Sequence, residues 1–279
     1  MKKIFLILLF ASTLPSFAQK SAPTSVVLDK GQKLSVVTTM TQQIDMGMGM
    51  EMKNNSNAQN SVSVIDANGK NYTISNTLTG IKISMEFMGQ QTDYDSDLKK
   101  DSASEIGKTI KNLNIPDTVK IDKFTGSVIP DGKKAEVVKS DSSNPMEGLF
   151  ESMGEVNADA VVSESFLVIP AGKKVGESWI DSSSTKGQKT TRKFTIKSID
   201  KNIVITTIAS TMETNLDTEA NGMSITVKMT TKMDTEVISN LETSLVSKRT
   251  SKADITGTIE LMGQSAPITG SSSTTTIVQ

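Results

Sequence analysis

Apolar and polar side chains alternate along residues 34–52, which is the clearest pattern in the sequence. Even positions from Leu34 to Met52 are mostly apolar, whereas Ser, Thr, Asp and Glu recur at odd positions. A period of two predicts a β-strand with one buried face. Because a single strand of this length is unusual, we expect Gly47 and Gly49 to bend it or to break it once.

Further turns are predicted where polar residues and glycines interrupt this alternation. A polar turn is expected at 54–59, and the Asn-Gly pairs at 68–69 and 221–222 are typical of tight β-hairpins. Along 72–87 the apolar positions change parity at Gly80. One extra residue in a strand restores the same face, so the change predicts a β-bulge.

Two short helices are predicted in the middle of the chain. Ser-Ala-Ser-Glu at 102–105 has the form of a capping box, and apolar residues at helical spacing continue to about 114. A second amphipathic segment follows Pro145 and ends near Gly154. The sequence therefore predicts a mainly β (α+β) protein with a long-stranded, strongly curved antiparallel sheet or sheets and two short helices.

The same elements suggest a division of the chain into segments. We expect a signal peptide at 1–18, an N-terminal β half at 19–140 containing the helix at about 102–114, a helical connection at 141–165 and a C-terminal β half at 166–279. Both halves contain a Met-bearing strand, an Asn-Gly turn and an aliphatic-Met-Gly-Gln strand end, which favours two repeated halves. The alternative is that long amphipathic strands resemble one another without duplication.

The N-terminus is typical of an exported protein. Lys2 and Lys3 precede the apolar run 4–10, and small residues at Ser16 and Ala18 fit a cleavage site near Ala18. We expect the mature chain in the periplasm or outside the cell. No later apolar run reaches the roughly 20 residues of a membrane span, so no transmembrane segment is expected in the mature chain.

Composition excludes several kinds of chemistry. The 279 residues contain no His and no Cys, which removes Ser-His-Asp triads, thiol nucleophiles, disulfides and His/Cys metal sites. Lys and Arg total 30 against 31 Asp and Glu, and Arg192 and Arg249 are the sole arginines, so nucleic-acid binding is not expected. We expect no enzyme activity and no cofactor.

A row of methionines is the main candidate for ligand contact. Thioethers at every second position of 46–52 would project from one strand face and suit Cu(I) or Ag(I). Methionine also lines apolar cores and pockets, and exposed methionine scavenges oxidants. Apolar lining is the preferred interpretation, without a metal site, and the candidate ligand-binding residues are Met40, Ile44, Met46, Met48, Met50, Met52, Ile83, Met85, Met229 and Met233.

Acidic residues at 93–97 are spaced like the start of a calcium loop. The sixth position is Leu98 rather than Gly and the twelfth is Ser104 rather than Glu, so the segment does not fit an EF-hand. We interpret it as a solvated strand end.

Two segments carry a resemblance to a known family. Lys-Gly-Gln-Lys at 30–33 enters the first long strand, and Pro-Ala-Gly-Lys-Lys-Val-Gly-Glu-Ser-Trp occupies 170–179. With the leader, the helices and the terminal strands, they resemble an uncharacterised domain family of exported Bacteroidota proteins across about 25–279. The resemblance implies fold and compartment but no activity. The chain is more distantly similar to lipoprotein carriers with a half-barrel sheet and a helical lid.

Long strands with one apolar face must bury that face, and two short helices are too few to cover it. We therefore expect a non-enzymatic exported binding protein whose concave apolar β surface holds a lipid or another hydrophobic ligand. One alternative is a β scaffold that binds an envelope protein through strand edges. The other is Met-based Cu(I) or Ag(I) binding.

Overall fold

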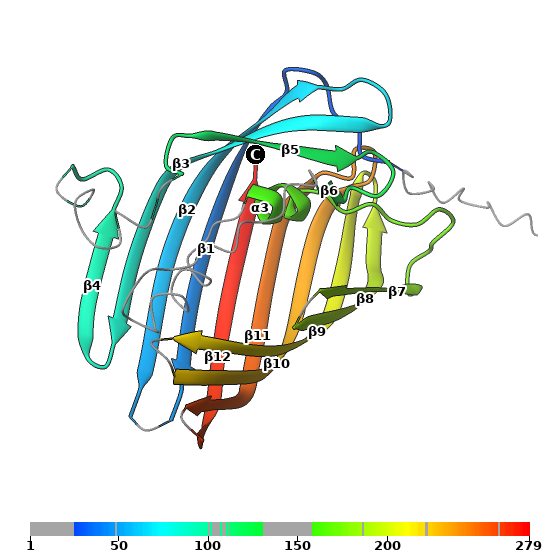
Figure 1. Cartoon of the computed structure of the whole chain (residues 1–279). Coiled ribbons are helices and arrows are strands. Elements are labelled where there is room, and N and C mark those ends of the chain that lie inside the picture. The colour runs from blue at the N-terminus through cyan, green and yellow to red at the C-terminus, as the bar shows by residue number, and fades with distance from the viewer. Residues whose placement is uncertain are drawn as a thin grey trace, which may run out of the picture.

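One antiparallel sheet of twelve strands dominates the computed structural model (Figure 1). The model describes residues 25–47, 49–99, 101, 107, 110, 112–130, 158–185, 187–220, 223–261 and 263–279. The strands are β1 (Lys33–Asp45), β2 (Glu51–Asp66), β3 (Asn71–Phe87), β4 (Gln90–Asp95), β5 (Pro116–Asp122), β6 (Val128–Ile129), β7 (Ser178–Thr185), β8 (Gln188–Asp200), β9 (Ile203–Ala220), β10 (Met223–Asn240), β11 (Val246–Leu261) and β12 (Gln264–Val278). The helix α3 (Ala158–Glu164) packs on this sheet.

The first and last strands meet in the centre of the sheet. The spatial order is β6-β5-β3-β2-β1-β12-β11-β10-β9-β8-β7, and β4 pairs with β3 outside this path. At the seam between β1 and β12, Val36 lies opposite Val278. The outermost strands of this order, β6 and β7, do not pair with each other, so the described sheet stays open.

The strand register assigns side chains to two faces, because residues directly opposite each other on antiparallel strands share a face. Val36 and Val62 lie on the face against which Val162 of α3 packs. We call this side the inner face; in Figure 1 the helix lies in front of it. Even-numbered residues of β1 and β12 and odd-numbered residues of β11 and β10 belong to it.

Two apolar clusters occupy opposite ends of the inner face. Leu34 belongs to the first, at the start of β1, and Ile44 to the second, at its end. The α3 cluster comprises Val26, Leu28, Leu34, Val36, Val62, Val64, Tyr72, Ile74, Val119, Ile121, Ala158, Val161, Val162, Phe166 and Val278. The turn cluster comprises Ile44, Met46, Met52, Ile225, Val227, Ile255, Ile259, Ala266 and Ile268. Both ends of the curved sheet bend toward this face (Figure 1).

Two glycines permit a close approach of strands where the sheet curls. A Cβ at Gly270 of β12 would lie 2.6 Å from the carbonyl oxygen of Gln43 on β1. A Cβ at Gly257 of β11 would collide with the carbonyl oxygen of Lys228 and lie 2.9 Å from the Cα of Met229. Since both neighbours are backbone atoms, only glycine fits without moving a strand.

Two local predictions are confirmed. The hairpin at 68–69 joins β2 to β3, and Gly69 has a φ of 66°. The register between these strands shifts at Gly80, where Gln59 pairs with Gly80 but Asn60 pairs with Leu78. The intervening residue is therefore the extra residue of the predicted bulge.

A third local prediction is confirmed, and one is wrong. The strand expected over 34–52 is broken once at the two glycines, between β1 and β2, by a turn in which Met50 N–H donates to the Gly47 carbonyl at 2.9 Å. Gly47 and Gly49 have φ angles of 71° and 78°, which glycine adopts readily. The polar turn expected at 54–59 is instead part of β2, whose Asn and Ser side chains are accommodated by pairing with β1 and β3.

The mainly β class is confirmed, whereas the number of helices differs from the prediction. The described residues contain one helix, α3, within the segment 141–165 that was expected to be helical. Ala158, Val161 and Val162 are its buried residues, at helical spacing. The predicted helix after Pro145 and most of that at 102–114 lie outside the described residues, as does the predicted signal peptide at 1–18.

None of the helical segments in the described parts of the chain is long and apolar enough to cross a membrane. Strands from both predicted halves belong to one sheet, and the division of the chain into two β halves stays a prediction.

Candidate binding surface on the inner face

A belt of small, polar and sulfur-containing side chains separates the two apolar clusters of the inner face. Along β1 it runs from Thr38 through Met40 to Gln42, between Val36 and Ile44. We call it the middle belt. Its members are Thr38, Met40 and Gln42 on β1, Asn54, Ser56 and Ala58 on β2, Ser272, Thr274 and Thr276 on β12, Arg249, Ser251 and Ala253 on β11, Met233 and Thr235 on β10, Ser210 on β9 and Arg192 on β8.

Four of the predicted ligand-binding residues are half-buried on this face. Met40 lies opposite Ser56, which in turn lies opposite Ile83 on β3. Met85 follows Ile83 on the same face, and Met233 is opposite Ala253 in the belt. The sheet therefore brings Met40, Ile83, Met85 and Met233 to one concave side with part of each side chain accessible.

The remaining predicted residues lie at the turn end of the face. Met46 and Met52 are buried at 6% and 2% exposure among aliphatic side chains. Of the other predicted ligand-binding residues, Ile44 is buried in the same cluster, and Met50 and Met229 are partly buried against it. Met48 lies outside the described residues. Since the turn after β1 separates Met46 from Met52, the methionines of 46–52 do not form a row on one strand.

The inner face carries buried polar atoms without partners. The atoms without a hydrogen bond belong to Gln42, Asn54, Asn60, Asn76, Arg192, Thr206, Ser210 and Arg249, and each of these residues is on the inner face by register. Most buried polar groups in proteins are hydrogen-bonded, and leaving one unpaired costs about 1–3 kcal/mol. The face therefore offers donors and acceptors to water or to a bound molecule.

Arg192 and Arg249 are the charged residues of this face on β1–β3 and β8–β12 in the part of the chain that the structure describes, and Asp181 on β7 lies opposite Arg192 on the same face. Neither residue is among the ligand-binding residues predicted from the sequence. The available signal was parity: Arg249 continues the odd-numbered row of Ala253 and Ile255, whereas Lys252 faces the opposite side.

Both arginines make few contacts. Arg249 Nη2 donates to the backbone carbonyl of Glu164 at 3.3 Å. Burial lowers the pKa of the Arg249 guanidinium, the charge of Glu164 raises it, and the charge of Arg192 lowers it further. Arg192 Nη2 lies 3.5 Å from Asp181 Oδ2 on β7. The Arg192 guanidinium is therefore near enough for its charge to act on Arg249.

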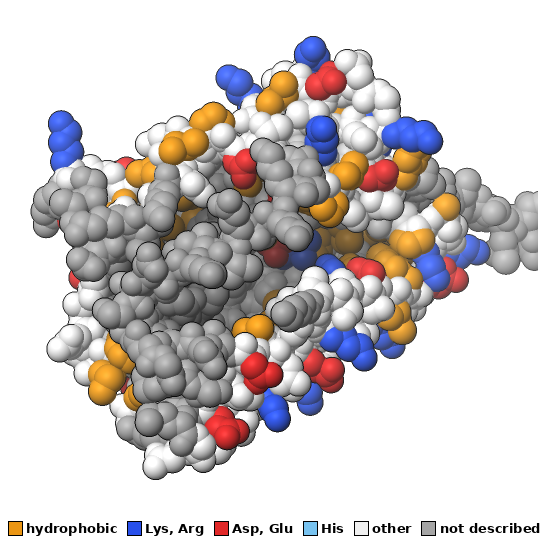
Figure 2. Space-filling view, in the orientation of Figure 1, with side chains coloured by type: hydrophobic (Ala, Val, Ile, Leu, Met, Phe, Trp, Pro, Cys, Tyr) orange, Lys and Arg blue, Asp and Glu red, His pale blue; other side chains and the backbone are white. Residues whose placement is uncertain are grey.

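Figure 2 shows a recess on this side, with hydrophobic side chains visible in the part that described residues line, toward the right of the view. Most charged side chains in that view lie around its margin. Two further open grooves, of about 620 and 410 Å³, are lined largely by outer-face residues such as Lys228 and Lys252. The candidate surface is therefore the inner face rather than either groove.

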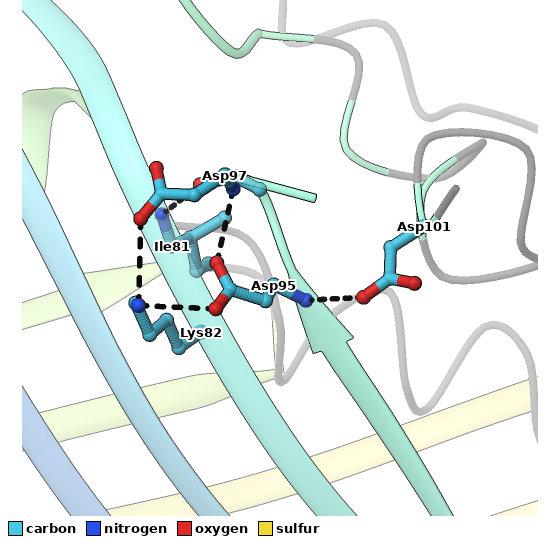
Figure 3. A network of polar contacts seen from close by, with 6 residues as sticks. Ile81, Lys82, Asp95, Asp97 and Asp101 are labelled. Atoms are coloured by element: carbon cyan, nitrogen blue, oxygen red, sulfur yellow. Dashed lines mark hydrogen bonds and ion pairs between the residues drawn. The ribbon is translucent and has the colours of Figure 1, made fainter. Parts of the chain in front are cut away.

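The acidic segment at 93–97 forms an ion-pair network on the outer face (Figure 3). Lys82 Nζ lies 3.0 Å from Asp95 Oδ2 and 3.4 Å from Asp97 Oδ2. The backbone N–H of Asp95 donates to Asp101 Oδ2 at 3.0 Å. The described residues contain no group of three or more acidic side chains placed to hold a metal ion. This segment fastens β4 to β3.

Comparison with solved structures shows weak likenesses. A structure of lipovitellin, titled for its lipid–protein interactions, has a TM-score of 0.44 and 8% identity over 90% of this chain and 25% of that chain. The chain thus spans a quarter of the lipovitellin chain. OccK5 and OpdQ of Pseudomonas aeruginosa have TM-scores of 0.21 and 0.24 at 7% identity, over 90% of this chain and 98% and 99% of theirs.

No curated protein matches the sequence. The model of a family of unknown function, DUF6263, matches residues 69–246, which is most of the chain. This match confirms the expectation of an uncharacterised family. The chain belongs to the DUF6263 family.

Proposed function

We propose that the protein binds a lipid or another hydrophobic molecule along its inner face and acts by binding, without catalysis. The observation that carries the proposal is the set of half-buried apolar residues Met40, Ile83, Met85 and Met233 on one concave side of the sheet. We further propose export to the periplasm or the exterior, which follows from the sequence of 1–18.

The arrangement of apolar surface supports this proposal. The α3 cluster and the turn cluster bury the two ends of the inner face, and further apolar residues between them, such as Ala58, Ile208 and Val237, are also buried. Met40, Ile83, Met85 and Met233 keep accessible surface on the same face. Completing the burial of one such side chain contributes up to about 1.5–3 kcal/mol. Methionine adapts its shape to irregular apolar partners, so Met40 and Met233 suit a flexible acyl chain.

A neutral apolar dye tests the proposal. We expect Nile red fluorescence to rise saturably with the intact chain, and Met40→Asp to weaken the affinity at least about tenfold, because a carboxylate is costly in an apolar site. Thr41 is the next residue along β1, and its side chain lies on the outer face. Thr41→Asp therefore adds the same charge outside the proposed site and should leave binding unchanged. Circular dichroism verifies that both variants fold.

Two results would contradict the proposal. One is the absence of saturable binding by the folded chain. The other is equal Nile red affinity for the Met40→Asp and Thr41→Asp variants, which would place any dye outside the inner face.

A further inference from the structure

We propose that the hydrophobic ligand carries an anionic oxygen group, a carboxylate or a phosphate, held between Arg192 and Arg249 in the middle belt. This inference rests on the proposed function and specifies the class of ligand. It concerns two residues outside the set predicted from the sequence.

The fold places both guanidinium groups on one side of the sheet. Arg192 lies opposite Ser210 on β9, and Arg249 lies opposite Thr276 on β12, so both face inward from strands separated by β9 and β10. Along the register, Arg192 is level with Ala253, four residues from Arg249 on β11, and the curvature of the sheet brings the two strands toward each other across the hollow (Figure 1). The charge of Arg192 lowers the pKa of Arg249.

Each guanidinium keeps donors free within the described structure. The Nε of Arg192 and the Nε of Arg249 are buried without a hydrogen-bond partner. The contact of Arg249 is with a backbone carbonyl, and that of Arg192 is a single ion pair of 3.5 Å. Guanidinium presents five N–H donors in a fork that fits carboxylate and phosphate oxygens, so both residues have capacity for an anion.

The surroundings favour an anion over a cation. The carboxylates that interact with the pair are Asp181, directly opposite Arg192 on β7, and Glu164 at the end of α3. The other belt side chains are uncharged, and Ser210 Oγ is buried without a partner among the described residues. A charge-assisted hydrogen bond in such surroundings is stronger than one between neutral groups.

The position also fits an amphipathic molecule. Met233 on β10 lies opposite Ser210 of β9, the strand next to Arg192, and Ala253 is the second inward residue after Arg249 on β11. A head group between the arginines would therefore leave its chain against the apolar part of the same face. An amphiphile with one anionic end matches both features.

Trp179 provides a reporter at the site. It is the one tryptophan of the chain and stacks on Phe194, which lies two residues from Arg192 on the same face. Its fluorescence can be followed during titration with tetradecanoate, tetradecyl phosphate or tetradecanol, each below its micellar concentration at pH 8. We expect both anions to bind at least about tenfold more tightly than the alcohol, equivalent to about 1.4 kcal/mol.

Matched variants assign that preference to the arginines. Arg192→Gln and Arg249→Gln should each reduce anion affinity about tenfold while changing tetradecanol affinity less than about twofold. Lys193→Gln and Lys248→Gln remove neighbouring charges from the outer face and should change neither. Arg249→Lys keeps the positive charge but lacks the forked arrangement of N–H donors. It replaces Arg249→Gln in this test if the Gln variant fails to fold.

The outcomes separate this inference from the function on which it rests. Binding of tetradecanol and Nile red without any preference for the anions would overturn the anion site alone. Absence of binding by all of these probes would overturn both proposals. Tighter binding of tetradecyl phosphate than of tetradecanoate would identify a phospholipid-like head group, and tighter binding of tetradecanoate a fatty-acid-like one. If both Gln variants still bound the anions more tightly than tetradecanol, the assignment of the site to the arginines would be refuted.

Discussion

The indole of Trp179 lies flat against the ring of Phe194, with ring centroids 4.9 Å apart and 4° between the planes. The two residues are directly opposite each other on β7 and β8. Phe194 is buried at 7% exposure and packs in a cluster with Ile208 and Val237. The stacked pair therefore fastens the outermost strand β7 to the body of the sheet.

Truncating this contact should destabilise the protein. We expect Phe194→Ala to lower the free energy of unfolding by about 3–5 kcal/mol, because it removes a buried ring and leaves a cavity. Denaturant unfolding followed by circular dichroism measures the change. Phe124→Ala removes a ring that is 57% exposed and is the control; a similar loss in both variants would contradict this role of Phe194.

Adding a methyl group at Gly257 should also destabilise the sheet. The new Cβ would meet the backbone of Lys228 and Met229, so β10 and β11 would have to separate. We expect a loss of about 1–3 kcal/mol in the free energy of unfolding.

Gly80→Ala is the matched control for Gly257→Ala. Its Cβ would lie 3.7 Å from the nearest atom, a Gln59 side-chain oxygen, so we expect a change of less than about 1 kcal/mol. Equal unfolding midpoints for the two variants would show that the strands near Gly257 separate freely.

Adjacent residues of the last strand test the assignment of faces. Val278 is 6% exposed and belongs to the α3 cluster, whereas Ile277 is 39% exposed on the outer face. We expect Val278→Asp to lower the free energy of unfolding by about 3–5 kcal/mol, because an unpaired charge enters the core. Ile277→Asp should have a much smaller effect, and the opposite order in thermal unfolding would overturn the register of the seam.

The network of Figure 3 should make the edge of the sheet sensitive to acid. The hydrogen bond from the Asp97 N–H and the contact with Lys82 lower the pKa of Asp95 below its ordinary 3.8. A carboxylate with a depressed folded-state pKa stabilises the fold above pH 3.8, and this contribution is lost as the pH falls through the lower value. Asp95→Asn should therefore lose less stability than the parent between pH 6 and pH 3.

Lys82 sets the alkaline limit of the same network. Its contacts with Asp95 and Asp97 raise the pKa of its amine above 10.5, so its contribution is present below that pH and decreases above it. Unfolding curves at several pH values measure both limits. Asp254→Asn removes an exposed carboxylate from β11 and is the control; identical acid sensitivity in both Asn variants would contradict the role of Asp95.

Local features of the fold were predictable because they depend on neighbouring residues. The φ of 66° at Gly69 and the parity change at Gly80 have direct signals in the sequence. The break between β1 and β2 also had a local signal in Gly47 and Gly49, although Met46 and Met52 keep the parity of one continuous strand across it. The pairing of β1 with β12 has no local signal at all.

The part of the candidate surface that depends on neighbouring residues was also predictable. Met40, Ile83, Met85 and Met233 follow from alternation alone, since each lies in a row of inward residues. The nearness of Arg192 to Arg249 depends on the curvature of strands that intervene between β8 and β11, which single-strand periodicity does not contain.

The central seam also affects the order of folding. Thr38 and Thr276, whose side-chain hydroxyls lie 3.2 Å apart across it, are 238 residues apart in the chain. Closing a loop of this length is entropically costly, and proteins rich in such distant contacts fold slowly. During synthesis β1 emerges well before β12 and gains its second neighbour only when β12 has been made, so a long strand edge stays open to unwanted pairing until then.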